Sequence, residues 1–161
     1  HARRGAIGKE YRYFIWNDRV VPSFLRLYRT PVPDRLDVSA MREAAAQLVG
    51  RHDFAAYSAN PNREIDGTVR HLFALRVNGK GKEISITAIG DGFLYRMVRS
   101  LAGFLIRVGS GQLSAGDGVM IRESRVRTAR VPTASAQGLF LWRVFYPGDE
   151  KRLGARIRAV R

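Results

Sequence analysis

The stretch GDGFLYRMVRSLAGFLIRVGSG, residues 90–111, carries the strongest structural signal in the sequence. Between Phe93 and Ile106 its apolar residues recur at positions i, i+1, i+4 and i+5. That spacing is typical of an amphipathic helix with a period of about 3.6 residues, and Gly109 and Gly111 mark its end. A second face of the same helix consists of Arg96, Arg99, Gly103 and Arg107. We therefore predict a helix with one apolar face directed to a core and one face rich in arginine.

Arg99 has two interpretations. In the first, it belongs to a solvated polar face from which long arginine side chains reach water. In the second, Gly103 lets another backbone or a ligand approach closely because it has no Cβ, and Arg99 pairs with a buried carboxylate or phosphate. Both interpretations are compatible with the spacing.

Alternating aromatic and aliphatic residues elsewhere in the chain predict strands. KEYRYFIWND (9–18) and GLFLWRVFYP (138–147) show this alternation. TVRHLFALRV and KEISITAIG do so as well, and they flank Asn78-Gly79-Lys80-Gly81, in which Asn-Gly is a pair typical of hairpin turns.

A helix is predicted over residues 39–50, with Asp37 or Ser39 as its N-cap. Residues 112–137 suggest only a short helix, because glycines within the segment weaken it. The order strand, helix, hairpin, helix, strand predicts an α+β fold, an antiparallel sheet with helices packed on one face. We expect one domain over residues 1–147 and a loose basic tail over residues 148–161.

Composition limits the classes of partner. The 161 residues carry a net charge of +14, which points to a polyanion. Nucleic acid is the first candidate, and an anionic membrane surface is the second, although the basic residues are not gathered on one amphipathic helix. No apolar run approaches the roughly 18 residues of a membrane-spanning helix. The absence of cysteine excludes disulfides and thiol chemistry, and the histidines lack metal-ligand spacing, so no metal is expected.

Five segments in order carry a resemblance to a known family. They are HARR…KEYRYFIWN, LVGRHDF, TVR, GDGFLYRMVRSLAGFLIRVG and TASAQGLFLWRV. Their order and intervals resemble the C-terminal half of the tRNA pseudouridine synthase A family, from His1 to about Pro147. The resemblance implies one half of a pseudouridine synthase fold, with residues 1–147 as the domain that binds tRNA and completes the active site.

The resemblance also implies an activity. Members of this family are isomerases that convert uridine to pseudouridine in the tRNA anticodon arm, without metal or organic cofactor and usually as homodimers. Their essential aspartate lies in an Arg-Thr-Asp-Ala-Gly motif of the N-terminal half. None of the aspartates in this sequence lies in such a motif. We therefore expect the chain to be inactive alone.

Two residues of this sequence match the family's active-site positions. Lys9-Glu10-Tyr11 matches a basic-x-Tyr motif, which implies that Tyr11 packs on the target base, as an extruded base requires. The alternative is that Tyr11 is a core tyrosine of its strand, with Tyr13 on the opposite face. Arg99 matches the arginine that pairs with the catalytic aspartate and keeps it ionised.

Other assignments complete the predicted site. Four arginines are expected to line the RNA path, with simple solvated charges as the alternative: Arg3, Arg4, Arg70 and Arg96. Asp53 and Phe54 are expected to fix the loop after the first helix, and Gly103 to allow close packing beside Arg99.

Two origins of the chain are possible. Its start at His1 favours a fragment of a longer tRNA pseudouridine synthase, because a natural cytosolic chain would normally begin with Met, although removal of an organelle transit peptide would also leave such a start. We expect a cytoplasmic location, with a mitochondrial or plastid matrix as the alternative. The alternative is a non-catalytic RNA-binding module of a ribonucleoprotein particle derived from that family.

Overall fold

The computed structural model of the chain describes residues 5–63 and 66–160. Its elements in chain order are β1 (Gly8–Trp16), β2 (Thr30–Pro31), α1 (Val38–Leu48), β3 (Gly50–Asp53), β4 (Val69–Lys80), β5 (Glu83–Gly90), α2 (Met97–Gly109), α3 (Asp117–Ser124), β6 (Leu139–Phe145) and α4 (Glu150–Val160). Short 3-10 turns lie at Ala55–Tyr57, Pro61–Arg63 and Ala136–Gly138.

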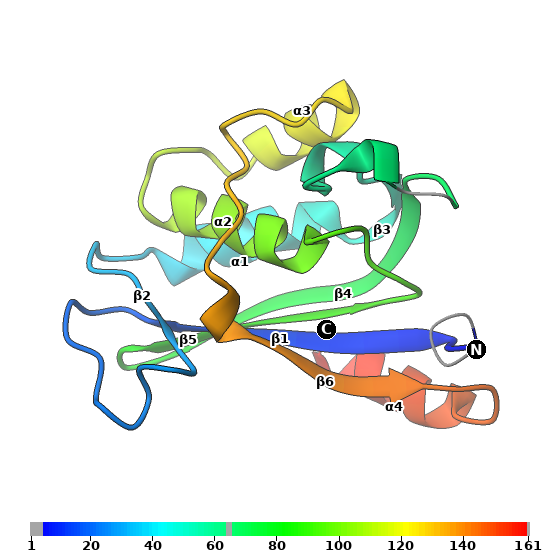
Figure 1. Ribbon diagram of the computed structural model, residues 1–161, viewed down its shortest axis with the longest axis horizontal. Helices are drawn as coiled ribbons and strands as arrows, with labels where there is room; N and C mark the ends of the chain where they lie inside the picture. The colour runs from blue at the N-terminus through cyan, green and yellow to red at the C-terminus, as the bar shows by residue number, and fades with distance from the viewer. Residues whose placement is uncertain (1–4, 64–65, 161) are drawn as a thin grey trace.

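The sheet has the strand order β2-β1-β5-β4-β3, and β6 pairs with β1 (Figure 1). All pairs are antiparallel except β1 with the two-residue β2, where Ile15 lies opposite Thr30. The predicted α+β class is confirmed. The sheet is mixed and not purely antiparallel, because the short strand β2 runs parallel to β1.

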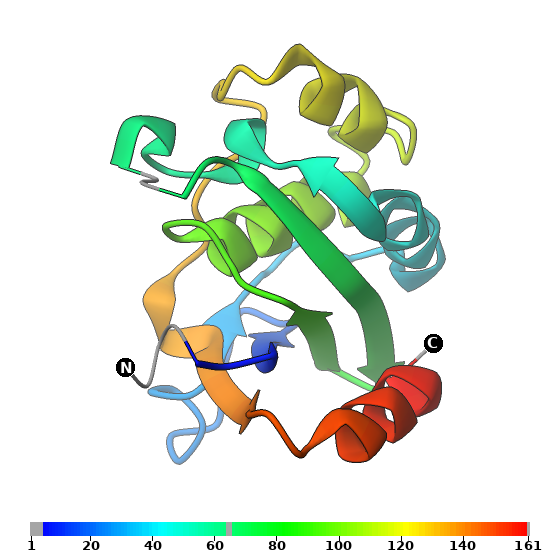
Figure 2. The same cartoon turned by 90° about the vertical axis from the view of Figure 1, so that its right-hand side faces the viewer.

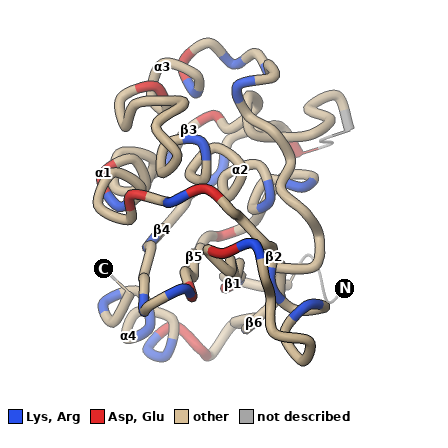
Figure 3. The backbone as a smooth tube through the Cα atoms, turned by 90° about the vertical axis from the view of Figure 1, so that its left-hand side faces the viewer, with Lys and Arg blue, Asp and Glu red and all other residues tan. Residues whose placement is uncertain are grey.

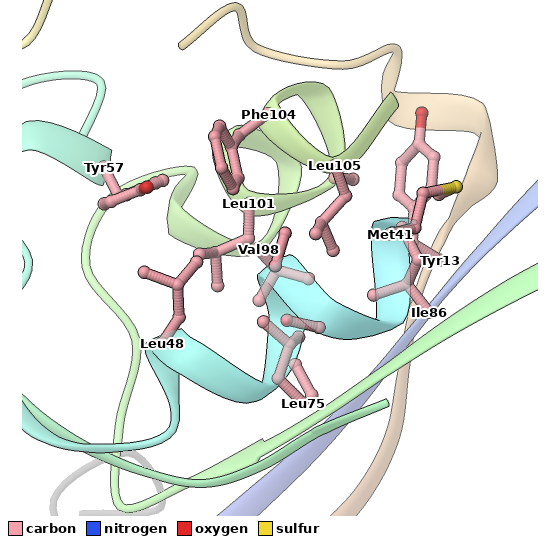
Figure 4. Close-up of a cluster of buried hydrophobic side chains, with 14 of the residues drawn as sticks. Tyr13, Met41, Leu48, Tyr57, Leu75, Ile86, Val98, Leu101, Phe104 and Leu105 are labelled. Atoms are coloured by element: carbon pink, nitrogen blue, oxygen red, sulfur yellow. The ribbon is translucent and has the colours of Figure 1, made fainter. Parts of the chain in front are cut away.

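The main core lies between the sheet and the helices α1 and α2. Figure 4 shows Leu48, Val98, Leu101 and Phe104 packed above Leu75 of β4. Helix α1 begins where Asp37 accepts hydrogen bonds from the amides of Ser39 and Ala40, so Asp37 is the N-cap. Its apolar face is fully buried.

Helix α2 begins at Met97, whereas the apolar pattern in the sequence already begins at Phe93. Arg96 adopts a left-handed φ of 56°, which interrupts helical backbone, and the residues before it form a loop. The short helix expected in residues 112–137 is α3. Gly118 permits α3 to lie against α2, because a Cβ there would be 2.8 Å from Cζ of Phe104.

The predicted hairpin between β4 and β5 is present, but its turn differs from the expected one. Lys80 pairs with Glu83, so the two turn residues are Gly81 and Lys82, and Gly81 has a φ of 59°. Asn78 and Gly79 lie within β4. A Cβ on Gly79 would be only 3.1 Å from Val38, so this glycine serves strand–helix packing.

Strand β1 places Tyr11 and Tyr13 on the same face, because residues two apart in a strand share a face. Tyr13 is fully buried in the main core, and Tyr11 is packed against it. The expectation that Tyr13 lies opposite Tyr11 was wrong. The other face of β1 carries Glu10 and Arg12.

The C-terminal segment is a helix and not the loose tail that was expected. Leu153 and Val160 of α4 are buried against Ala74, Ile89 and Phe145. Ionic contacts add to this packing, because Arg156 makes two hydrogen bonds of 2.8 Å to the fully buried Glu10. Helix α4 therefore covers part of the sheet face opposite α1 and α2 (Figures 1 and 2). No helix among the described residues is long and apolar enough to span a membrane.

Candidate functional site

Arg99 lies in the first turn of α2 and is held by the segment that leads to β6. Its Nε donates a hydrogen bond of 2.6 Å to the carbonyl oxygen of Ala134. The amide of Ala134 in turn donates to the carbonyl of Arg99, at 3.1 Å. These two contacts fix the orientation of a partly buried guanidinium group.

Gly103 explains why this segment can lie so close to α2. A Cβ at Gly103 would be 2.0 Å from the carbonyl oxygen of Pro132, far inside van der Waals contact. Only glycine therefore allows the backbone at Pro132 to cross the helix here. The expected close approach of a second backbone is present, and it is made by the segment that orients Arg99.

Tyr13 anchors the same segment to the sheet. Its hydroxyl donates to the carbonyl of Ser135 at 2.8 Å and lies 2.7 Å from Oγ1 of Thr30. Because the tyrosine has one hydroxyl proton, Thr30 donates in the second bond. Burial raises the pKa of Tyr13, and the Thr30 hydrogen bond and the charge of Arg99 offset part of that rise. Tyr13 is therefore neutral at physiological pH.

Arg127 ties the same segment to α2. Its guanidinium donates to Oγ of Ser100 at 2.9 Å and to Oγ1 of Thr133 at 2.8 Å. Burial lowers the pKa of Arg127, but an arginine remains charged under such conditions. No sequence motif singled out Arg127 or Tyr13 for this role, although Tyr13 lies within KEYRYFIWN, one of the segments that carry the family resemblance.

Tyr11 is half-buried in the middle of β1, between Ala88 of β5 and Leu141 of β6. Its ring makes an edge contact with Phe93, with the ring centroids 5.2 Å apart. Tyr11 therefore lies on the side of the sheet that α2 covers, which is also the side of Arg99 and Tyr13.

The predicted RNA-binding arginines divide into two groups. Arg70 and Arg96 flank the loop before α2: Arg70 lies beside Gly92, and Arg96 stacks over Tyr95 with its guanidinium 4.9 Å from the ring centroid. Arg3 and Arg4 lie outside the described residues.

Asp53 and Phe54 have structural contacts. Asp53 accepts a hydrogen bond of 2.9 Å from the amide of Ala55 at the start of a 3-10 turn, and it lies 3.5 Å from Nε of Arg125. Phe54 is fully buried and packs against Tyr57. Within residues 5–63 and 66–160, no group of three His, Asp or Glu side chains could hold a metal ion.

The electrostatics of the site are set by Arg99. Among the described residues, no carboxylate forms an ion pair with it, and its only hydrogen-bond acceptor is the Ala134 carbonyl. A fixed, partly desolvated guanidinium of this kind is suited to bind a carboxylate or phosphate. Of the two tyrosines of β1 on this side of the sheet, Tyr13 is fully buried, and the half-buried Tyr11 is the one suited to contact a flat ring.

Known proteins resemble most of this chain in sequence. A family model described as tRNA pseudouridine synthase matches residues 44–147, which include Arg99 and Gly103. The tRNA pseudouridine synthase A of Bacillus pumilus (strain SAFR-032) is 40% identical over 146 residues, which cover 91% of this chain and 59% of the relative. The proteins of the same name from Bacillus licheniformis and Bacillus subtilis are 42% and 38% identical with the same coverage. The chain thus spans about three fifths of the length of these relatives, 59% in each case. The match to this family model over residues 44–147, together with relatives that are 38–42% identical over 91% of the chain, shows that the chain belongs to the tRNA pseudouridine synthase family.

Proposed function

We propose that this chain forms part of an enzyme that converts uridine to pseudouridine in tRNA. The observation that carries the proposal is Arg99, which is oriented by the Ala134 carbonyl and has no carboxylate partner among the described residues. An arginine fixed in this way is suited to hold a catalytic aspartate that another segment or chain supplies.

The proposed reaction exchanges one bond to the ribose for another. The bond between N1 of uracil and C1′ of ribose breaks, the base turns, and C5 bonds to C1′. The proton on C5 is lost and N1 gains a proton, so the product is an isomer of uridine. In this reaction Tyr11 packs on the turning base, and Arg99 keeps the aspartate ionised and in position.

The substrate proposal rests on charge and on the relatives. The net charge of +14 suits a nucleic acid, and the names of the relatives specify tRNA. We propose the anticodon arm as the modified region and a homodimer as the working form of the complete enzyme.

Catalysis by the chain alone is the first test. A tRNA tritiated at C5 of its uridines releases tritium when pseudouridine forms, and filter binding on the same tRNA reports affinity. We expect salt-sensitive binding without tritium release from the chain alone, and release when a protein segment with the Arg-Thr-Asp-Ala-Gly motif is joined to it. Tritium release by the chain alone, or no binding of tRNA, would contradict the proposal.

A second function, a non-catalytic RNA-binding module, is favoured by the same unpaired Arg99, which could contact a phosphate. The two functions differ in one result. If the joined protein binds tRNA but never releases tritium, the module is the better description.

A further inference from the structure

The face of the sheet opposite Tyr11 and Arg99 is only partly covered by α4 (Figure 2). Beyond that helix, the strand register sets residues of this face in rows. Arg12, Thr87 and Arg76 lie side by side on β1, β5 and β4, and Phe140 of β6 lies beside Arg12. In the next row, Phe14, Ser85 and Asn78 are neighbours.

Three arginines surround a hollow of about 260 Å³ on this face, which we call the arginine pocket. Its walls are Arg12, Arg76, Asn78, Ser85, Thr87 and Arg156, together with the end of α4. Glu10 neutralises part of the positive charge of the pocket, because Arg12 and Arg156 both form ion pairs with it. Arg76 donates to the Asn78 side chain at 3.3 Å and to the Val160 carbonyl at 3.2 Å, contacts long enough to be exchanged.

The pocket retains capacity for an anion. Within the described residues, Arg12 uses only its Nε in a hydrogen bond, to Glu10, and neither of its terminal nitrogens has an acceptor. Hydroxyl groups of Ser85 and Thr87 lie in the same pocket. Guanidinium and hydroxyl donors around a hollow of this size match the oxygens of a phosphate group.

Aromatic rings continue the surface from Arg12. The guanidinium of Arg12 stacks over Trp142 at 4.0 Å from the ring centroid, and that of Arg29 stacks over Phe14 at 4.2 Å. Together with Phe140 and Tyr28, these rings line a second hollow of about 250 Å³. Trp142 is 43% exposed and Tyr28 50%. We call Phe14, Tyr28, Phe140 and Trp142 the aromatic surface.

We infer that this face is a second RNA-binding surface, on which a phosphate of unpaired RNA occupies the arginine pocket and an adjacent base stacks on Trp142. Arg12 lines the arginine pocket and also stacks on Trp142. The phosphate contact and the base contact are therefore close enough to be made by neighbouring groups of one RNA strand. The inference rests on the proposed RNA substrate but requires no catalysis, and it places a contact on the sheet face away from Arg99.

Charge favours RNA over a second copy of this chain. Arg12, Arg29, Arg76 and Arg156 all lie on this face, and Figure 3 shows further basic positions along α4. Glu10 and Glu83 pair with three of these four arginines, so the face keeps an excess of positive charge. A second copy would bring the same positive surface, and like charges oppose such an arrangement. Aromatic residues interleaved with arginines are instead typical of surfaces that bind single strands by stacking and phosphate contacts.

The test uses a labelled single-stranded RNA of about ten nucleotides, within the site sizes of such binders. Arg76→Gln and Trp142→Ala change exposed residues and leave the ion pairs of Glu10 intact. We expect each to weaken binding by about tenfold. Arg76→Gln should also reduce the slope of log affinity against log salt by about 0.7, while Trp142→Ala should leave that slope unchanged.

Matched controls lie nearby. Arg152→Gln removes one charge from α4, where the side chain is 74% exposed and outside the pocket. Tyr146→Ala removes an aromatic residue of similar exposure, 42%, that lies outside the aromatic surface. Both should bind as the unchanged chain does. In a Trp16→Phe background, Trp142 is the single tryptophan, and RNA should quench its fluorescence.

Other outcomes would overturn the inference in distinguishable ways. If RNA binding is unaffected by Arg76→Gln and Trp142→Ala but weakened by Tyr11→Ala, all contact lies on the Arg99 side, and the proposed function stands without this surface. If sedimentation shows a dimer that Trp142→Ala dissociates, with RNA affinity unchanged, a second copy covers the face. If the chain binds neither this RNA nor tRNA, both proposals fail.

Discussion

Gly103 and Pro132 approach so closely that a Cβ on the glycine would lie 2.0 Å from the proline carbonyl oxygen. This contact seats the segment before β6 on α2. The same segment supplies the Ala134 carbonyl to Arg99 and the Ser135 carbonyl to Tyr13. A single glycine thus makes room for the backbone that orients the site.

Gly103→Ala should therefore destabilise the chain and disturb the site. Because the clash is with backbone and not with a flexible side chain, we expect a loss of about 1–3 kcal/mol in the free energy of unfolding, measured with urea. Gly116→Ala is the control, since a Cβ there meets nothing within 4 Å and its φ is −68°. Equal stability of the two variants would contradict this role for Gly103.

Tyr13→Phe removes a hydroxyl that makes two hydrogen bonds in a fully buried position. The Ser135 carbonyl and the Thr30 hydroxyl would lose their partner, and we expect a cost of about 1–3 kcal/mol in the free energy of unfolding. Tyr146→Phe, at an exposed tyrosine, should have almost no effect in the same thermal or urea titration. A Tyr13→Phe variant as stable as the unchanged chain would show that water replaces these bonds.

Glu10 should make the stability of the chain depend on pH. Burial by itself raises the pKa of this carboxyl, but the hydrogen bonds and charges of Arg156 and Arg12 outweigh burial and lower the pKa below its ordinary value. A lowered pKa in the folded state contributes stability that is complete above about pH 4.5, the ordinary value, and is lost as pH falls through the folded-state pKa.

The measurement is the free energy of unfolding from pH 7 down to pH 3. Glu10→Gln should lower stability at pH 7 by about 1.5–3 kcal/mol and flatten the fall below pH 4.5. Asp117 and Asp149 also have lowered pKa values, so the difference between the two curves isolates Glu10. Glu123→Gln, at an exposed side chain, should keep the full fall. Parallel curves for Glu10→Gln and the unchanged chain would contradict the prediction.

The sequence predicted those elements whose apolar residues repeat with a clear period. Helices α1 and α2 and the long strands have many buried residues at regular spacing, so their patterns are strong. Helix α4 buries only Leu153 and Val160. Two apolar positions in a basic segment do not form a recognisable helical pattern in the sequence. The hairpin turn was misplaced because two glycines compete, and the register that directs Ile84 and Ile86 to the core selects Gly81.

The candidate site was predictable only in part. Arg99 and Gly103 share one helix face, and that spacing is visible in the sequence. The carbonyls of Ala134 and Ser135 were not predictable, because a backbone oxygen is present at every residue and leaves no signal in the sequence. Arg127 was missed for a related reason: its partners Ser100 and Thr133 become neighbours only after folding.

Arg99 gives the sharpest functional prediction, in a protein where the chain is joined to the segment with the aspartate motif. If Arg99 positions that aspartate, Arg99→Ala should lower kcat by about 100-fold while tRNA affinity changes little. The aspartate would also lose a neighbouring positive charge, so its pKa should rise and the acidic limb of the pH–rate profile should move to higher pH.

Two further variants separate charge from geometry. Arg99→Lys retains the charge but cannot reproduce the bond from Nε to the Ala134 carbonyl, so kcat should fall less than in Arg99→Ala, and the acidic limb should move less. Arg51→Gln, at an exposed arginine of β3, should leave kcat and the pH profile unchanged. Equal losses in kcat and tRNA affinity for Arg99→Ala, with an unmoved pH profile, would instead assign Arg99 to an RNA phosphate.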